Sequence, residues 1–474
     1  MKVLLLRPGY VRRSYFTRFN LSEALTEIYV GPVLADRHEV RVVDLRVRPD
    51  LERELQGWVP DAAVVAVHPQ TLGGLDALLA RLRRLAPRLR VLLVGAAEYG
   101  IEHLVERPQD FMRPLADALV PGFYLRPVRR IVAEALAAWD EGRALRDVPG
   151  LWIRDGGAGG GASGWQQTAV VPHTVGDIGV PDRTLLGRAR GAYSLGGVRR
   201  MAYVVYTFGC RYSCRYCSMS KVGGSIQTPR AIRDVIAELA ELSEPNVFLS
   251  DFEPLQAPQA MLELADAIEA AGIRKRWYLL TRADSALEQA DVLERWKEIG
   301  LRWVFLGLDG HSEARLQQIG KGATLAANEA AVAAVRRLGL GPAVGITVPP
   351  DATRQEFVDI AAAARRLRAP LVDFTVETPM VGTRFHDQSA ERLTTRDWSL
   401  YDMHHAVLPT ALPLGEFYRE MTRLHVLAGR LSVPGMLRLY PLGDALRNVL
   451  GGPAAMLGAL RAARDHQSCG SASA

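Results

Sequence analysis

Short apolar runs alternate with stretches of helical periodicity along the first 145 residues. Such an alternation is typical of parallel strands joined by helices, because each crossover helix covers a sheet that is buried on both faces. We therefore predict a doubly wound parallel sheet for residues 1–145. The expected strands are residues 3–6, 40–44, 62–67, 91–95 and 115–120, and the expected helices are residues 22–34, 75–85 and 128–139.

A glycine-rich stretch separates this series from a second one. Residues 155–164 are mostly glycine, which is typical of a hairpin tip or a flexible linker, and we predict a linker over residues 146–200. Six further strand–helix repeats over residues 201–390 favour a partial parallel barrel, whose chemistry lies at the carboxyl ends of the strands. Residues 391–474 are predicted to be mainly helical. The expected barrel strands are residues 203–207, 247–250, 277–281, 303–308, 343–348 and 371–376.

The composition is that of an ordinary globular protein. The chain has 474 residues, of which 48% are hydrophobic and 23% charged, and these values exclude disordered, collagen-like and coiled-coil chains. No apolar run approaches the roughly 20 residues that a membrane span needs. The first eight residues show no cleavable signal. We therefore expect a cytoplasmic protein without a transmembrane segment.

The net charge of +6 is small for a chain of this length. The 58 basic residues are almost all arginine, which indicates a solvated arginine-rich surface rather than a nucleic-acid-binding stripe. We expect a small-molecule substrate and no nucleic-acid partner.

Three of the four cysteines lie within eight residues. Cys210, Cys214 and Cys217 have the spacing CxxxCxxC and directly follow the first strand of the second series, whereas Cys469 lies in a Gly/Ser/Ala-rich tail. Three thiolates this close can hold three irons of a cubane cluster and leave the fourth iron open to another ligand. A structural zinc site needs a fourth ligand, and no histidine is near these cysteines in the sequence. We favour the cluster over zinc or an incidental cysteine triplet.

The CxxxCxxC spacing with an aromatic residue before the last cysteine, here Tyr216, resembles the signature of radical S-adenosylmethionine (SAM) enzymes. The resemblance implies that the three cysteines ligate a [4Fe-4S] cluster whose remaining iron is chelated by SAM. It also implies that the reduced cluster cleaves SAM to a 5'-deoxyadenosyl radical, which abstracts hydrogen from an unactivated carbon. An electron donor such as flavodoxin or ferredoxin is implied by this chemistry.

Polar residues end the later strands in the order that the family shows. The second strand ends near Asp251, where the family places polar groups beside the SAM amino group, and the third ends at Arg282, beside the SAM carboxylate or ribose. A turn at residues 378–383 resembles the Thr-Pro-x-x-Gly-Thr turn of the family. The resemblance assigns no catalytic acid or base. It implies as cofactor-binding residues Tyr216, Asp251, Glu253, Arg282, Asp309 and Thr347.

A doubly wound domain, a linker and a radical SAM barrel, in that order, resemble the cobalamin-binding branch of the superfamily. Within this branch, residues 245–248, 273–279, 393–398 and 402–410 resemble the hopanoid C-3 methylase group. Members of the branch use cobalamin to carry a methyl group: the cobalt takes the methyl from one SAM, and a substrate radical made with a second SAM receives it. The resemblance implies C-methylation of a lipid or another secondary metabolite.

The first domain departs from the cobalamin pattern at its strand ends. Residues 7–10 lack the Asp-x-His-x-x-Gly element, residues 95–99 end in Glu98 and Tyr99, and residues 121–124 lack a Gly-Glu pair. Bulky side chains there can fill the space that a nucleotide tail needs. The alternative is a cobalamin-independent radical SAM dehydratase or rearrangement enzyme, for example on an aminoglycoside-type sugar. A non-catalytic cobalamin or metal sensor would need a DNA-binding or signalling module, of which the sequence shows no sign.

Two features beyond the barrel have two interpretations each. Tyr401, Asp402, His404 and His405 either face the substrate or belong to a packed helix. Apolar residues and arginines recur over residues 417–464, which is typical of a helix that packs on the barrel or of one that touches a membrane surface.

Overall fold

The computed structural model describes residues 1–11, 19–97, 102–122, 126–154, 164–171, 178–217, 219 and 228–450. Glu98, Tyr99, residues 123–124 and Cys469, on which some sequence expectations rest, lie outside this range. The chain divides into two compact units, one of residues 1–12 with 22–192 and one of residues 13–21 with 193–474.

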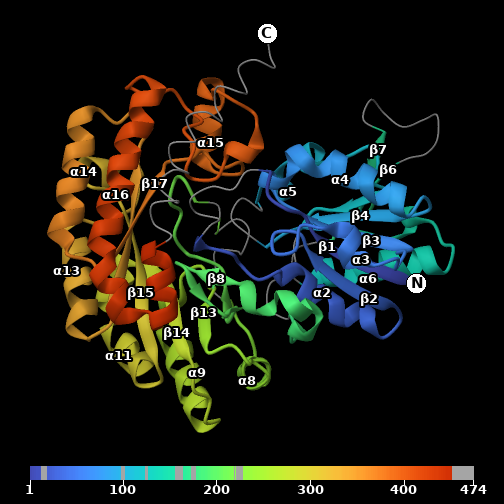
Figure 1. Ribbon diagram of the computed structural model, residues 1–474, viewed down its shortest axis with the longest axis horizontal. Helices are drawn as coiled ribbons and strands as arrows, with labels where there is room; N and C mark the ends of the chain where they lie inside the picture. The colour runs from blue at the N-terminus through green and yellow to red at the C-terminus, as the bar shows by residue number, and fades with distance from the viewer. Residues whose placement is uncertain are drawn as a thin grey trace. The chain divides into compact units, whose positions relative to one another are not determined.

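The first unit contains a seven-stranded sheet with the order β2-β1-β3-β4-β5-β6-β7 (Figure 1). The five strands β1 to β5 are parallel, as predicted, and all six residues of β3 are buried, as in a sheet covered on both faces. The strands are β1 (Lys2–Arg7), β2 (Glu39–Asp44), β3 (Ala62–Val67), β4 (Arg90–Gly95), β5 (Ala118–Val120), β6 (Trp152–Arg154) and β7 (Trp165–Gln167). The helices are α2 (Leu25–Ala35), α3 (Leu51–Leu55), α4 (Leu72–Leu85), α5 (Glu102–Glu106) and α6 (Arg126–Asp140).

Two strands flank the glycine-rich stretch, for which the sequence indicated a hairpin tip or a flexible linker. β6 pairs antiparallel with β5 and with β7, so the glycine-rich stretch joins the two strands of a hairpin. Part of the expected linker therefore extends the first sheet.

The second unit contains six parallel strands in chain order, β10-β13-β14-β15-β16-β17, as predicted for a partial barrel. They are β10 (Met201–Val204), β13 (Asn246–Leu249), β14 (Arg276–Arg282), β15 (Leu301–Asp309), β16 (Gly341–Val348) and β17 (Leu371–Val376). Two short pairs precede and follow β10, namely β8 (Ser194–Leu195) with β9 (Val198–Arg199) and β11 (Thr207–Phe208) with β12 (Thr228–Pro229). The helices are α8 (Ile232–Ala240), α9 (Pro258–Ala270), α10 (Ala283–Glu288), α11 (Ala290–Glu298), α12 (Glu313–Gln318), α13 (Leu325–Arg337), α14 (Arg354–Leu367), α15 (Arg384–Ser389) and α16 (Leu414–Leu439).

Alternation along the strands separates the helix-covered face of this sheet from its inner face. On β16, Val344 and Ile346 are buried in the cores beneath the outer helices, which Figure 1 shows along one side of the sheet. Gly345 and Thr347 point the other way, because successive side chains of a strand alternate between faces. A Cβ on Gly345 would lie 2.7 Å from Cζ of Phe305, so a larger residue there would force the Phe305 ring to move. The parallel strand order of both sheets and the helices that follow β17 confirm the predicted α/β fold with a helical C-terminal region.

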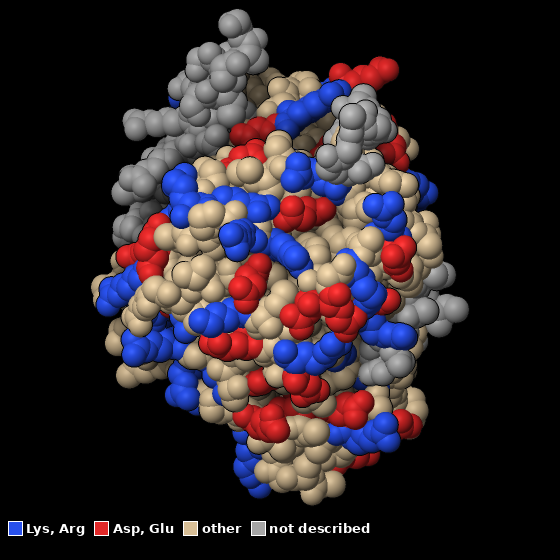
Figure 2. Space-filling model, turned by 90° about the vertical axis from the view of Figure 1, so that its right-hand side faces the viewer, with Lys and Arg blue, Asp and Glu red and all other residues tan. Residues whose placement is uncertain are grey.

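The surface gives no sign of a single-sign stripe on the face that Figure 2 shows, where positive and negative side chains are interspersed. Within the described part of the chain, no helix has the length and apolar character needed to cross a membrane.

Candidate active site

The three clustered cysteines lie in the loop that follows β11, at the carboxyl end of the first barrel strand. None of the three forms a disulfide bond, and all three are half-buried. The backbone N–H of Cys217 donates to the carbonyl oxygen of Cys214 over 3.1 Å, which makes a tight turn between them. The loop therefore presents three sulfurs from one short segment.

Asp251 holds the entry to this loop from beneath. Its carboxylate is 1% exposed and accepts from the N–H of Tyr206 at 2.7 Å, the N–H of Thr207 at 2.8 Å and the Thr207 hydroxyl at 2.6 Å. Burial raises the pKa of Asp251 to about 7, although these hydrogen bonds oppose the shift. Since protein donors occupy both oxygens, the structure places Asp251 under the loop rather than in an open cofactor pocket.

Glu253 has the equivalent role at the next strand, β14. It is 2% exposed, accepts from the N–H of Arg282 at 2.7 Å and contacts the Thr281 hydroxyl. Burial raises its pKa, and these two donors lower it. The second expected carboxylate thus fixes the carboxyl end of β14, and with it the position of Arg282.

Arg282 lies beside the cysteine loop in a fixed orientation. Its guanidinium donates to the Asp284 carboxylate at 2.9 and 2.6 Å and to the carbonyl oxygen of Lys321 at 2.7 Å, and its Cζ lies 3.9 Å from the centre of the Tyr212 ring. Burial alone would lower the pKa of Arg282, but Asp284 raises it, so the side chain stays charged. A fixed cation therefore stands where the sequence predicted one.

Side chains donate hydrogen bonds to the sulfurs of Cys210 and Cys214. Arg282 Nη1 lies 3.5 Å from Cys214 Sγ, and Gln256 Nε2 lies 3.4 Å from Cys210 Sγ. Gln256 Oε1 in turn accepts from the N–H of Arg211 at 2.9 Å. Hydrogen bonds to the sulfurs are one of the means by which a protein sets the reduction potential of an iron–sulfur cluster.

Tyr216 belongs to a partly buried network with Asp309 and Lys321. The Tyr216 hydroxyl donates to Asp309 Oδ2 at 2.6 Å, and the Lys321 ammonium pairs with the same oxygen. Asp309 has a φ of 60°, a left-handed conformation that non-glycine residues rarely adopt, directly after a register shift in β15. Burial raises the pKa of Tyr216, so its hydroxyl remains a donor. Lys321 adds a second buried cation near the loop.

A buried carboxylate ties the cysteine loop to the end of β17. Glu377 lies 3.4 Å from Arg215 and also pairs with Arg315. The Arg215 guanidinium lies 4.4 Å from the centre of the Phe385 ring. The backbone N–H of Phe385 donates to the carbonyl oxygen of Arg215 at 3.0 Å. The cysteine loop follows the first barrel strands, and these contacts also fix it to residues that follow the last barrel strand, β17.

The sequence interpretation missed Gln256, Lys321 and Glu377. Lys321 had a weak signal, as one of only five lysines in the chain. The other two had none, because their partners are far away in the sequence.

Thr347 stands apart from this group. It lies on the inner face, 3.3 Å from the Thr375 hydroxyl of the neighbouring strand, and no described hydrogen bond joins it to the cysteine loop. The turn at residues 378–383 leads into α15, whose first N–H groups include that of His386, which donates to Thr383 Oγ1 at 3.1 Å.

Asp402 organises the segment that contains the two adjacent histidines. All three side chains are buried, and Asp402 Oδ1 accepts from the N–H of His404 at 2.9 Å and that of His405 at 3.0 Å. The same oxygen lies 3.0 Å from His405 Nδ1. These contacts support the packed interpretation of this segment.

The cysteine loop fits an iron–sulfur cluster. Within the described residues, no three His, Cys, Asp or Glu side chains are arranged around a single metal ion. A cubane cluster does not require such an arrangement, because each thiolate binds a different iron. Three thiols in one loop, with donors on Cys210 and Cys214, match that need.

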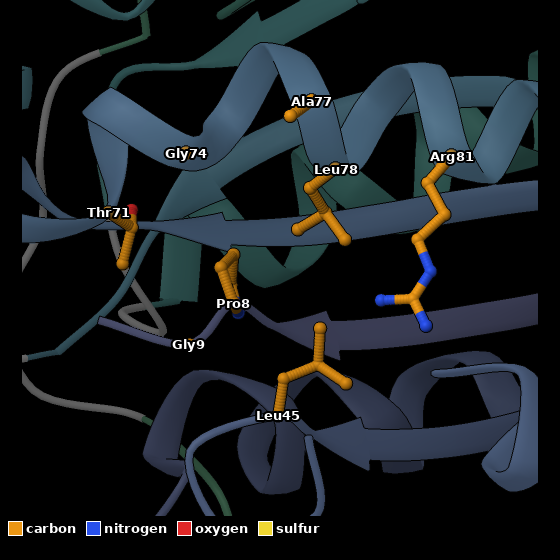
Figure 3. Close-up of a pocket in the computed structure, with 8 residues that line it drawn as sticks. All are labelled: Pro8, Gly9, Leu45, Thr71, Gly74, Ala77, Leu78 and Arg81. Carbon is orange, nitrogen blue, oxygen red and sulfur yellow. The ribbon is translucent and has the colours of Figure 1, made fainter. Parts of the chain in front are cut away.

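The first unit has a cavity at the carboxyl ends of β1 and β2, where doubly wound sheets bind their ligands (Figure 3). Its volume of about 260 Å³ is below the roughly 300–1,000 Å³ of drug-sized pockets, so it can enclose only part of a large cofactor. Buried ion pairs lie at the same strand ends, with Arg7 2.9 Å from Glu27 and Arg46 2.7 Å from Asp44. The cavity is lined by Pro8, Gly9, Leu45, Thr71, Gly74, Ala77, Leu78 and Arg81.

His68, the histidine that follows β3, serves the local backbone. It is buried and its Nδ1 accepts from the N–H of Gln70 at 3.3 Å, while its own N–H donates to the Thr71 hydroxyl at 3.0 Å. The ring thus caps the short turn that precedes α4.

Comparison with known proteins connects this geometry to a chemistry. Residues 204–364 match the model of the radical SAM superfamily. The chain is 29% identical over 388 residues to the hopanoid C-3 methylase of Methylococcus capsulatus, covering 81% of this chain and 72% of the relative. It is 23% identical over 418 residues to the anaerobic magnesium-protoporphyrin IX monomethyl ester cyclase of Cereibacter sphaeroides, covering 86% of this chain and 63% of that one.

A solved structure shares the fold over nearly the whole chain. The cobalamin-dependent SAM radical enzyme OxsB, with aqua-cobalamin and SAM bound, superposes with a TM-score of 0.68 and 12% identity. The match covers 97% of this chain and 72% of that chain.

Proposed function

Since the chain is a radical SAM enzyme, we propose that Cys210, Cys214 and Cys217 hold a [4Fe-4S] cluster and that the enzyme methylates an unactivated carbon of a lipid or another secondary metabolite. Bound together, the cluster and SAM supply a 5'-deoxyadenosyl radical, and cobalamin supplies the methyl carrier. The observation that carries the proposal is the loop of three cysteine thiols beside the fixed guanidinium of Arg282. The similarity to a methylase supports methyl transfer.

The chain's own residues divide into two groups in this proposal. Arg282 binds the SAM carboxylate, while Tyr216, Asp309 and Thr347 contribute further contacts to SAM. Asp251 and Glu253 act as positioning residues, because their oxygens already accept from the strand ends that they hold.

The other proposed partners follow from the reaction. In this proposal residues 1–145 form the cobalamin-binding domain, β6 and β7 add a hairpin to its sheet, and residues 201–390 form the radical SAM barrel. Each SAM cleavage consumes one electron, for which a flavodoxin- or ferredoxin-type donor in the cytoplasm is the proposed source.

Replacing Arg282 by alanine is expected to weaken SAM binding while the cluster remains. Loss of one charge-assisted contact to a carboxylate corresponds to at least about a tenfold rise in the Kd for SAM. Equilibrium dialysis with labelled SAM measures the Kd, and an iron assay reports the cluster. Arg295→Ala, which removes a surface cation paired with Asp266, Glu269 and Glu298, serves as the control and should leave both values unchanged. An Arg282→Ala enzyme that binds SAM as tightly as wild type would refute the assignment.

Anaerobic reconstitution with iron, sulfide and hydroxocobalamin tests the methyltransferase proposal directly. After desalting, we expect about one cobalt and about four irons per chain. Methyl-labelled SAM should then pass its label to an acceptor among candidate lipids and metabolites. Methylation would be contradicted if, with every class of acceptor tested, the label stayed in SAM and its own cleavage products.

A second candidate is hydrogen abstraction without methyl transfer, in a cobalamin-independent dehydratase or rearrangement enzyme. The buried ion pairs at the strand ends of the first unit support the absence of cobalamin, and the similarity to a cyclase supports a reaction other than methyl transfer. For this candidate, the same reconstitution should give about four irons and no cobalt per chain. SAM should still be cleaved to 5'-deoxyadenosine.

A further inference from the structure

In residues 437–450, at the C-terminal end of the described chain, the residues classed as exposed are all leucine, arginine or glycine. Residues 437–450 comprise the end of α16 and a further helical segment at 442–450. The exposed fractions are 52% for Leu437, 68% for Leu442, 49% for Leu446 and 80% for Leu450. We call this surface the leucine–arginine face. Its members are Leu437, Arg438, Leu442, Gly443, Leu446, Arg447 and Leu450.

The opposite side of the segment packs on the protein through small and polar residues. Ala445 is fully buried, and Asn448, which is 7% exposed, donates to the carbonyl oxygen of Gly196 at 3.4 Å. Gly197 has a φ of 83°, and a Cβ there would lie 2.3 Å from the Asn448 amide. The hydroxyl of Tyr440 also donates to Gly196, at 2.9 Å. The segment is therefore seated on the β8–β9 hairpin by its polar side.

This orientation is the reverse of that in an ordinary surface helix. A helix on a globular core turns its apolar stripe inward and its charges outward. Here Leu442, Leu446 and Leu450 recur every four residues, which places them on one side of the helix, facing away from the hairpin. Large contiguous apolar surfaces rimmed by polar groups mark interaction sites.

We propose that the leucine–arginine face binds the surface of an anionic lipid bilayer, where the enzyme takes up a lipid substrate. This proposal rests on the proposed function and narrows its substrate class from a lipid or another secondary metabolite to a lipid. Leucines on one helix side insert at the boundary between headgroups and acyl chains, and flanking arginines pair with lipid phosphates. Arg438 and Arg447 supply that charge, the latter also paired with Asp444 at 2.7 Å. Protein-binding surfaces are instead enriched in aromatic residues, of which the exposed set has none.

Vesicle flotation with the full-length, cluster-loaded enzyme tests the proposal. Wild type should float with vesicles of phosphatidylcholine and phosphatidylglycerol in equal amounts and remain largely unbound with phosphatidylcholine alone. The variant L442S/L446S/L450S should lose at least about tenfold in partitioning onto the mixed vesicles. The control V59S/V170S/V358S removes three other exposed apolar side chains, which are 51%, 73% and 60% exposed, and should float like wild type.

Three results would overturn the proposal. The first is a wild type that does not float with mixed vesicles, and the second is a leucine variant that floats as well as wild type. The third is a wild-type dimer in light scattering that the leucine variant turns into a monomer, which would assign the face to a second copy of the chain. Iron content and SAM cleavage without vesicles should be the same in both variants and wild type. Flotation with no SAM cleavage in wild type would refute the proposed function while lipid binding stands.

Discussion

Replacement of Cys210, Cys214 or Cys217 by alanine is expected to remove the cluster and abolish SAM cleavage. In the proposed cluster each thiolate is the protein ligand of one iron, so the loss of any one opens a second iron to solvent. Iron should fall from about four per chain to less than about one. The broad visible absorbance should disappear, and 5'-deoxyadenosine should fall below about one-hundredth of the wild-type amount. A colorimetric iron assay and chromatography of the SAM products measure both effects.

Cys469→Ala provides the matched control for this series. Cys469 is the fourth cysteine of the chain and stands far from the other three in the sequence. Its replacement should leave iron content and SAM cleavage at wild-type values. Retained SAM cleavage in any of the three loop variants would refute the ligand assignment for that residue.

Replacing Asp251 by alanine is expected to destabilise the second unit and to empty the cluster site. The carboxylate is 1% exposed and accepts three hydrogen bonds from Tyr206 and Thr207. Without it, buried donors are left unsatisfied beneath the cysteine loop. A loss of about 3–5 kcal/mol in the free energy of unfolding is expected for a buried group with several partners. Denaturant unfolding measures the loss, and iron per folded chain reports the loop.

The variant Asp402→Ala distinguishes the two expected effects of Asp251→Ala, namely loss of stability and loss of the cluster. Asp402 is likewise buried and accepts from two backbone N–H groups, those of His404 and His405. Its loss should destabilise the fold by a similar amount and leave the iron per folded chain unchanged. If both variants lost iron equally, the role of Asp251 would be general stability rather than support of the loop.

The sequence alone determined the order of the elements and the chemistry of the loop. Apolar runs predicted five parallel strands in the first sheet and six in the second, because strand burial and crossover helices impose a local pattern that survives in one dimension. The cysteines were singled out for the same reason, since they lie within eight consecutive residues, and their role as cluster ligands stays a prediction. Arg282 and Asp309 were singled out from their places at strand ends, which parallel topology brings together, and their role in SAM binding also stays a prediction.

The tertiary structure alone decided how the remaining groups are used. Asp251 and Glu253 look like cofactor contacts in the sequence, and only their burial beneath neighbouring strands shows that their oxygens are already occupied. Gln256 and Glu377 act on a loop from which 46 and 162 residues, respectively, separate them. The leucine–arginine face likewise depends on which side of a helix packs inward, and amphipathic spacing does not specify that. Each of these features arises from pairing between distant segments, which leaves no periodic trace in the sequence.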